Sequence, residues 1–331
     1  MTTDHTSGTE DAREQAPGWQ FEDDRGARVT AAAPPRRVVG YTQVAAALWD
    51  EGVRPAGHFG SLHDGGTPDP AKSGLLPLDE IPYHGPGGAL RIAELLATEP
   101  DLLVGVSYDG KRLYGVPEPV ADELEARVPT VVLDVGPGRG LAEVAARLAA
   151  LVASLGVATA EVPEGEGASG GAESGDGESG GPPLGPAARA ARLAGARERL
   201  RAAAAAAPDT RVLALSPAGP DTAYLARPTA WPDLRALAEH GVRLAAPAEG
   251  PGANWATAGW AEAAELAPGI VLGDVRGNAA GPAVFQDNAG WLALSSAATV
   301  LPWNPELPPS ALAQARFFDT VAEALAARAA S

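Results

Sequence analysis

The 331-residue chain contains no cysteine. This absence excludes disulfide bonds, thiolate metal ligands, a cysteine nucleophile and a lipid-anchoring cysteine. The sequence also lacks an apolar run long enough to span a membrane, and residues 1–18 have neither the basic nor the apolar region of a signal peptide. If the first residue is the natural start, these absences predict a cytoplasmic protein.

Positively charged residues are scarce, since 25 Lys and Arg stand against 42 Asp and Glu, for a net charge of −17. A general nucleic-acid binder needs a basic surface, and an anionic membrane would repel such a chain. We therefore expect neither nucleic acid nor a membrane surface as a partner. A local basic pocket for an anionic small molecule stays compatible with this composition.

Strand-like and helix-like patterns alternate along most of the chain, which is typical of an α/β fold with mainly parallel sheets. The segment 157–186 is dominated by Gly, Ser, Glu and Pro and has almost nothing to bury. The Ala-rich segment after it has high helix propensity. We predict two Rossmann-like α/β lobes joined by a single long bridging helix. The expected parts are a disordered tail (1–18), an N-terminal lobe (19–156), a flexible insertion (157–186), the bridging helix (187–207) and a C-terminal lobe (208–331).

Several short motifs occur together and in a fixed order: WQFEDDRGARVT, PPRRVV, AAALWDEGVRPAGHFG, EPDLLVG, PTVVLDV, WPDLRALAEHG and VLPWNPELP. The ordered set resembles the substrate-binding proteins of bacterial ABC importers, in the class whose two lobes are bridged by one helix. Within that class it resembles an actinobacterial siderophore-binder subgroup. The resemblance covers the chain from Trp19 to its end.

This resemblance implies a monomeric binding protein that holds an iron–siderophore, haem or corrinoid complex between its lobes. It implies a ferric chelate as ligand, no intrinsic cofactor, an ABC permease as partner and an extracytoplasmic, membrane-associated location. The alternative is a cytosolic derivative of the fold that acts as a carrier or an enzyme in natural-product metabolism.

Ligands of open α/β lobes bind beyond the C-terminal ends of the strands, here in the cleft between the lobes. Cationic and aromatic side chains suit a partly flat, anionic chelate. The alternatives are a solvated loop for 107–115 and a core position for the tryptophans. The candidate ligand-binding residues are Tyr41, Gln43, His58, Tyr108, Lys111, Arg112, Tyr114, Tyr224, Arg227, Trp231, Trp255 and Trp303.

The family implied by the motifs places one glutamate on each lobe to dock onto arginines of the permease. This chain has Ala93 and Ala261 at those positions, with Glu94 and Glu262 beside them. A displacement of one residue turns a helix side chain by about 100°. The sequence is therefore compatible with two alternatives: Glu94 and Glu262 dock onto the permease, or docking has been lost.

Three histidines, His58, His63 and His84, lie in one part of the first lobe, and Asp64 is adjacent to one of them. Direct binding of zinc or manganese is thus a third alternative, although the spacing matches no metal-binding motif. Neither a phosphate-binding loop nor a nucleophile elbow occurs in the sequence. We assign no catalytic residue and no metal ligand, and we expect a binding protein without enzymatic activity.

Overall fold

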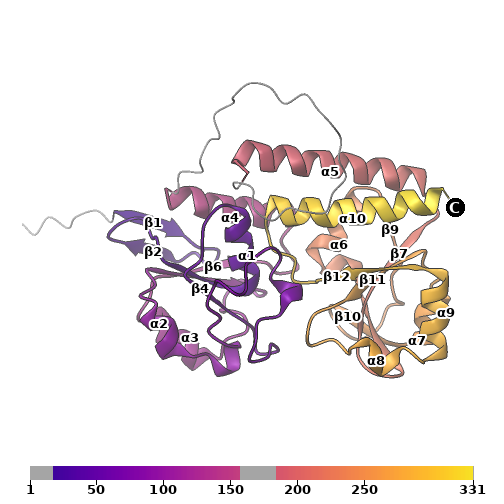
Figure 1. The fold of residues 1–331 in the computed structure, drawn as a ribbon, viewed down its shortest axis with the longest axis horizontal. Helices are drawn as coiled ribbons and strands as arrows, with labels where there is room; N and C mark the ends of the chain where they lie inside the picture. The colour runs from indigo at the N-terminus through magenta and orange to yellow at the C-terminus, as the bar shows by residue number, and fades with distance from the viewer. Residues whose placement is uncertain (1–17, 157–183, 331) are drawn as a thin grey trace, which may run out of the picture.

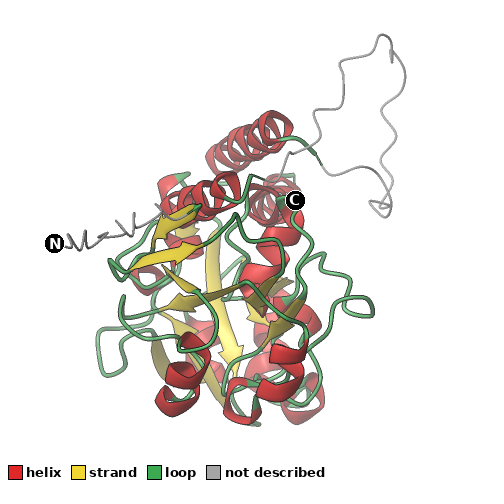
Figure 2. Ribbon diagram, turned by 90° about the vertical axis from the view of Figure 1, so that its left-hand side faces the viewer, coloured by secondary structure: helices red, strands yellow, loops and turns green. Residues whose placement is uncertain are grey.

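The computed structural model describes residues 18–156 and 184–330. The predicted tail, apart from Gly18, and the predicted insertion, apart from 184–186, lie outside the described residues. Two α/β lobes lie side by side, and the helices α5 (Pro186–Ala206) and α10 (Ala311–Ala329) run along one side of the molecule (Figure 1). Figure 2 shows the same strands from a view turned by 90°, with the helices packed around them.

The first lobe is built on a parallel four-stranded sheet in the order β4-β3-β5-β6. All residues of β3 and β5 are buried, as expected for central parallel strands that are covered on both faces. A separate antiparallel hairpin, β1–β2, precedes the sheet. The elements are β1 (Trp19–Glu22), β2 (Arg28–Ala31), β3 (Val38–Tyr41), α1 (Thr42–Asp50), β4 (Gly57–Phe59), α2 (Ile92–Ala97), β5 (Leu102–Ser107), α3 (Glu118–Glu125), β6 (Thr130–Asp134) and α4 (Leu141–Ser154).

The second lobe has a mixed sheet in the order β10-β8-β7-β11-β12, with β9 also paired to β7. The strands β7, β9, β11 and β12 are parallel, whereas β8 and β10 are antiparallel to their neighbours. The segment 222–226, which contains the candidate residue Tyr224, forms β8. The remaining elements are β7 (Arg211–Pro217), β8 (Thr222–Ala226), α6 (Pro232–Glu239), β9 (Arg243–Leu244), β10 (Trp255–Gly259), α7 (Trp260–Glu265), β11 (Ile270–Asp274), α8 (Pro282–Phe285), α9 (Ala289–Ala297) and β12 (Thr299–Trp303).

Helix α5 contacts both lobes and corresponds to the predicted bridging helix. Near its start, Arg189 Nη2 lies 2.7 Å from Glu51 Oε2, at the end of α1 in the first lobe. Further along, Leu193 and Leu200 belong to the hydrophobic core of the second lobe. Helix α5 therefore connects the two lobes through contacts with each of them. Among the described helices, none is both long and apolar enough to cross a membrane.

Candidate ligand site between the lobes

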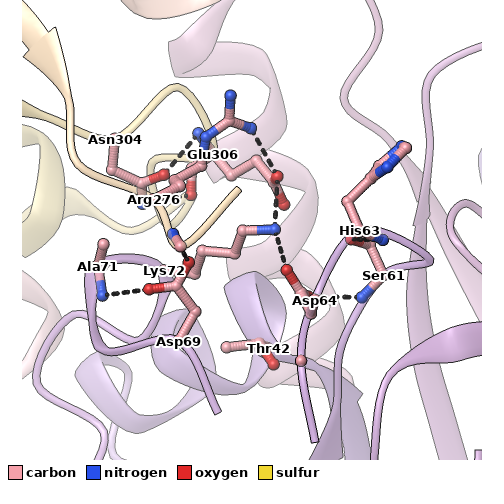
Figure 3. A network of polar contacts seen from close by, with 12 residues as sticks. Thr42, Ser61, His63, Asp64, Asp69, Ala71, Lys72, Arg276, Asn304 and Glu306 are labelled. Atoms are coloured by element: carbon pink, nitrogen blue, oxygen red, sulfur yellow. Dashed lines mark hydrogen bonds and ion pairs between the residues drawn. The ribbon is translucent and has the colours of Figure 1, made fainter. Parts of the chain in front are cut away.

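The two lobes meet at the carboxylate of Glu306, which lies in the loop after β12 and is 2% exposed. Its Oε2 accepts a hydrogen bond from Tyr41 Oη, at 2.5 Å. Its Oε1 lies 2.9 Å from Lys72 Nζ and 2.8 Å from Arg276 Nη1. Tyr41 and Lys72 belong to the first lobe and Arg276 to the second, so one carboxylate connects the two lobes. Figure 3 shows its ion pairs with Lys72 and Arg276.

Lys72 lies in the long loop between β4 and α2, and its side chain is only 1% exposed. Its Nζ contacts Asp64 Oδ1 at 2.5 Å in addition to Glu306. Burial alone would lower the pKa of Lys72, but the two carboxylates outweigh burial and hold this pKa above its usual value. Lys72 is therefore a buried cation whose charge is kept by its partners.

Arg276 follows β11 and is the corresponding cation of the second lobe. Its Nε and Nη2 donate to Asp274 Oδ1 and Oδ2, at 3.0 Å and 2.8 Å, which fixes the plane of the guanidinium. Burial would lower its pKa, but Asp274 and Glu306 raise it above the usual value. The guanidinium stays charged and points at the same carboxylate as Lys72.

Three tyrosines of the first lobe surround this point. The ring centroids of Tyr41 and Tyr114 are 6.0 Å apart, and those of Tyr108 and Tyr114 are 4.5 Å apart, both in edge-to-face geometry. Burial and then the Glu306 carboxylate raise the pKa values of all three phenols. Their hydroxyl groups are therefore neutral and can donate hydrogen bonds.

The second lobe contributes a cluster of three tryptophans. The ring centroid of Trp231 lies 4.8 Å from that of Trp255 and 5.8 Å from that of Trp303. Trp231 Nε1 donates to Asn254 O at 3.1 Å, which orients the indole. Trp303 is 2% exposed and belongs to the core of the lobe, and its ring contacts those of the other two tryptophans.

Two hollows adjoin the network. The first, which we call the slot, has a volume of about 40 Å³ and lies between residues of both lobes, including Gln43 and Tyr108 on one side and Trp231 on the other. The second, which we call the open hollow, has a volume of about 470 Å³. Its lining comprises Ser216, Pro217, Ala218, Tyr224, Trp255, Arg276, Asn278, Ala279 and Ala280.

Seven of the predicted ligand-binding residues lie around this junction. They are Tyr41, Gln43, Tyr108, Tyr114, Tyr224, Trp231 and Trp255. Five come from the C-terminal ends of strands or the segments that follow, as expected, but Tyr224 lies in the middle of β8 and Trp255 begins β10. Lys111 and Arg112 are exposed, and their backbone N–H groups donate to Asp109 Oδ1 in a turn.

The structure gives His58 and Arg227 other surroundings than predicted. The His58 side chain is completely buried, shares a hydrogen bond of 3.0 Å between Nδ1 and Thr42 Oγ1, and packs on Tyr83. Arg227 donates to four backbone carbonyls of the 248–252 loop, at 2.9 to 3.1 Å. Neither residue lines the slot or the open hollow.

Sequence reasoning missed the central residues Lys72, Arg276 and Glu306. Arg276 and Glu306 follow the strands β11 and β12, so the rule that selected the other candidates would also have found these two. Lys72 lies within a Gly- and Pro-rich loop without a local pattern that marks it.

The three histidines do not form a common metal site in the structure. His58 and His84 are buried, whereas His63 is exposed. Within 18–156 and 184–330, no three His, Asp or Glu side chains are grouped as ligands of one metal ion would be.

Glu94 and Glu262, which stand beside the expected docking positions Ala93 and Ala261, both have accessible side chains. Glu94 on α2 is 64% exposed at its side chain and pairs with Arg91 Nε at 2.7 Å. Glu262 on α7 is exposed, and its Oε2 accepts from the backbone N–H of Gly259 at 2.7 Å.

No family model matches the chain, and no curated protein matches it. Solved structures do. The ferric-siderophore receptor protein DesE from Streptomyces coelicolor is 27% identical, with a TM-score of 0.77 over 93% of this chain and 98% of DesE. The siderophore-binding protein FhuD from Vibrio cholerae, solved with Fe³⁺–Desferal, is 16% identical, with a TM-score of 0.58 over 88% of this chain and 98% of FhuD.

A periplasmic haem-binding protein from Pseudomonas aeruginosa is 19% identical, with a TM-score of 0.57 over 88% of this chain and 93% of that protein. These likenesses confirm the predicted fold class and the resemblance of the motifs. The chain is therefore similar, in both lobes and over nearly the whole length of these proteins, to the two-lobed binding proteins for siderophores and haem.

Proposed function

We propose that the chain binds an anionic metal chelate, a ferric siderophore, between its two lobes as the substrate-binding component of an ABC importer. One observation carries the proposal. Each lobe contributes one buried cation to the junction, Lys72 from the first and Arg276 from the second, and aromatic side chains of both lobes surround them. The likeness to DesE supports the same class of ligand.

The chemistry of this junction suits such a ligand. Guanidinium and ammonium groups bind the anionic oxygens of a chelate, and neutral tyrosine hydroxyls add hydrogen bonds. Aromatic faces cover its flat apolar parts. In the structure the Glu306 carboxylate takes the place of such an anion against both cations. Hinge opening would expose Lys72 and Arg276, and closure over the chelate would bury them again.

The same proposal includes an extracytoplasmic location and a permease partner. The exposed helices α2 and α7 lie on different lobes, so Glu94 and Glu262 could form two separate contacts with one membrane protein. Neither the described part of the chain nor the similar structures favour the alternative of a cytosolic carrier or enzyme.

The test is a fluorescence titration of the seven tryptophans against ferric siderophores, haem, corrinoid and free zinc. We expect the ferric chelates to bind, and Arg276→Ala to weaken them at least tenfold, because about 1.4 kcal/mol corresponds to tenfold and loss of a buried charged contact usually costs more. The matched control is Arg243→Ala, since that side chain is 59% exposed.

Two results would overturn the proposal. One is that none of the chelates binds to the correctly folded protein. The other is that Arg276→Ala and Arg276→Lys both bind a chelate as tightly as the parent, with thermal unfolding showing that the variants are folded. Tight binding of zinc alone would favour the direct-metal alternative.

A further inference from the structure

The loop between β4 and α2 reaches from the first lobe to the second through the side chain of Asp69. Its Oδ2 accepts a hydrogen bond from the backbone N–H of Gly277, at 2.8 Å. Gly277 stands between Arg276 and Asn278 in the sequence, and both of these residues line the open hollow. Asp69 therefore joins the first lobe to one wall of the open hollow.

The Asp69 carboxylate is held in place by its own loop. Its Oδ1 accepts from the backbone N–H of Ala71 at 3.0 Å, which caps a short 3₁₀ helix at Pro70–Lys72 (Figure 3). Ser73 Oγ donates to the backbone oxygen of Asp69 at 2.7 Å. Because both carboxylate oxygens have defined partners, the side chain has a fixed orientation toward Gly277.

The turn that contains Gly277 is fixed within the second lobe in a similar way. The backbone N–H of Arg276 donates to Asp274 Oδ1 at 3.0 Å, and the N–H of Ala280 donates to Pro217 O at 2.8 Å. The hydrogen bond between the lobes thus joins two segments that are each anchored in their own lobe. Opening of the lobes breaks it.

This contact differs from the contact at Glu306 in its relation to the ligand. Glu306 is bound to both cations, so a chelate that binds Lys72 and Arg276 takes its place. The partner of Asp69 is a main-chain N–H instead, so a chelate on the cations does not have to displace Asp69. The same hydrogen bond is compatible with closed lobes in both cases, with Glu306 or with a chelate on the cations.

We propose that Asp69 is a latch that holds the lobes closed in both of these forms, and that it sets how fast the chelate enters and leaves but not how tightly it binds. A contact that is present in both closed forms stabilises both equally, so it cancels from the dissociation constant. Entry and exit both require the open form, so the latch slows both by the same factor. The inference rests on the proposed function, because the chelate is the ligand whose exchange the latch controls.

The experiment uses two replacements of Asp69 that keep the cap of the short helix. Asp69→Asn keeps an oxygen for the N–H of Ala71 and places an amide NH₂ group against the N–H of Gly277. Asp69→Ser also caps a helix well, but its side chain is too short to reach the other lobe. The matched control is Asp79→Asn, which removes the same charge from an exposed position of the same loop.

Stopped-flow tryptophan fluorescence, with the ferric siderophore that binds in the titration, gives both rate constants. We expect association and dissociation each to become about fivefold faster in both Asp69 variants, because one net hydrogen bond changes an equilibrium by about this factor. The dissociation constant should stay within about twofold of the parent value. Asp79→Asn should exchange the siderophore as the parent does.

Two kinetic results would overturn the latch. One is that both Asp69 variants exchange the siderophore at the rates of the parent protein. The other is a loss of affinity at an unchanged association rate, because Asp69 would then act only in the complex.

A second measurement needs no chelate. The chain contains no cysteine, so Gln43→Cys places a single thiol at the slot between the lobes, where residue 43 is 5% exposed. Its rate of reaction with a maleimide reports the fraction of open molecules when opening and closing are fast relative to labelling. In this background both Asp69 variants should react about fivefold faster, whereas Asp79→Asn should not.

The thiol measurement separates failure of the latch from failure of the proposed function. If no chelate binds but the labelling rates differ as expected, the proposed function is wrong and the latch between the lobes stands. If a chelate binds and the labelling rates are equal, the latch is wrong and the proposed function stands.

Discussion

Replacement of Glu306 by glutamine tests how the lobe junction controls ligand binding. The change keeps the shape of the side chain and removes one negative charge from a site with two cations and three carboxylates, those of Asp64, Asp274 and Glu306. Removing one partner of a buried ion pair costs about 3–5 kcal/mol when the remaining charge stays buried. Here the lobes can open and let water reach Lys72 and Arg276. We therefore expect a shift of about 2 kcal/mol toward the open form, close to thirtyfold.

The same change should increase the affinity for an anionic chelate. If the chelate binds Lys72 and Arg276 as proposed, it must displace Glu306 from both cations in the parent protein, and the apparent affinity is reduced by the small fraction of molecules that are open. Without the charge on Glu306, we expect the chelate to bind at least tenfold more tightly. The gain is bounded by the shift in the opening equilibrium.

The assay has two parts, each with a matched control. Small-angle X-ray scattering of the ligand-free protein should show a larger radius of gyration for Glu306→Gln, and fluorescence titration with a ferric chelate should show the tighter binding. The control is Glu80→Gln, because Glu80 pairs at 3.0 Å with Arg54 on the surface, where both side chains are more than half exposed. An unchanged radius together with weaker chelate binding would refute the reasoning and would show that Glu306 orients the cations for the ligand.

Three further predictions follow from the same structure. Burial, with a smaller effect from the neighbouring histidine, lowers the pKa of His58 from 6.5 to about 4, so the unfolded chain binds a proton between these values and the native protein does not. The free energy of unfolding should thus fall by about 3 kcal/mol from pH 7.5 to pH 4 through this group. In His58→Gln, urea denaturation should show a smaller change of the unfolding free energy with pH. An equal change in the variant would contradict this. Arg227→Ala should lower the free energy of unfolding by about 2 kcal/mol through the loss of its hydrogen bonds to the 248–252 loop, and chelate affinity should stay unchanged. Weaker chelate binding without a loss of stability would show instead that Arg227 contacts the ligand. The double variant Glu94→Ala, Glu262→Ala should reduce siderophore uptake by cells while the purified protein binds as before; unchanged uptake would show that these glutamates do not dock.

The first lobe shows how far sequence reasoning reaches when all strands of a sheet run in the same direction. Tyr41 ends β3 and Tyr108 follows β5, and both lie at the predicted edge of the sheet. Because parallel strands all end at one edge, a list of the residues after each strand is also a list of neighbours in space. This is why the tyrosines could be predicted together, without knowledge of any contact.

Lys72 could not be predicted in the same way. The loop that contains it has no regular spacing of apolar residues that would indicate a strand or a helix. Its Nζ lies at the junction because Asp64 and Glu306 bind it there. One of these partners is 8 residues away in the sequence, and the other is in the second lobe. A buried lysine is unfavourable unless carboxylates compensate it, so the position becomes explicable only once both partners are placed.

The two arginines of the second lobe show why the rule about strand ends needs the direction of each strand. Arg276 follows β11, which is parallel to β7, and so it lies at the edge that faces the first lobe. Arg227 follows β8, which is antiparallel to β7: Pro217 pairs with Ala223 near the start of β8, and Leu215 pairs with Leu225. The rule for parallel strands therefore does not apply to β8: Tyr224 within this strand lines the open hollow, whereas the guanidinium of Arg227, three residues later, donates to carbonyls of the 248–252 loop. Alternating apolar residues reveal a strand but not its direction, and without the direction the rule about strand ends cannot say which of these two arginines lies at the junction of the lobes.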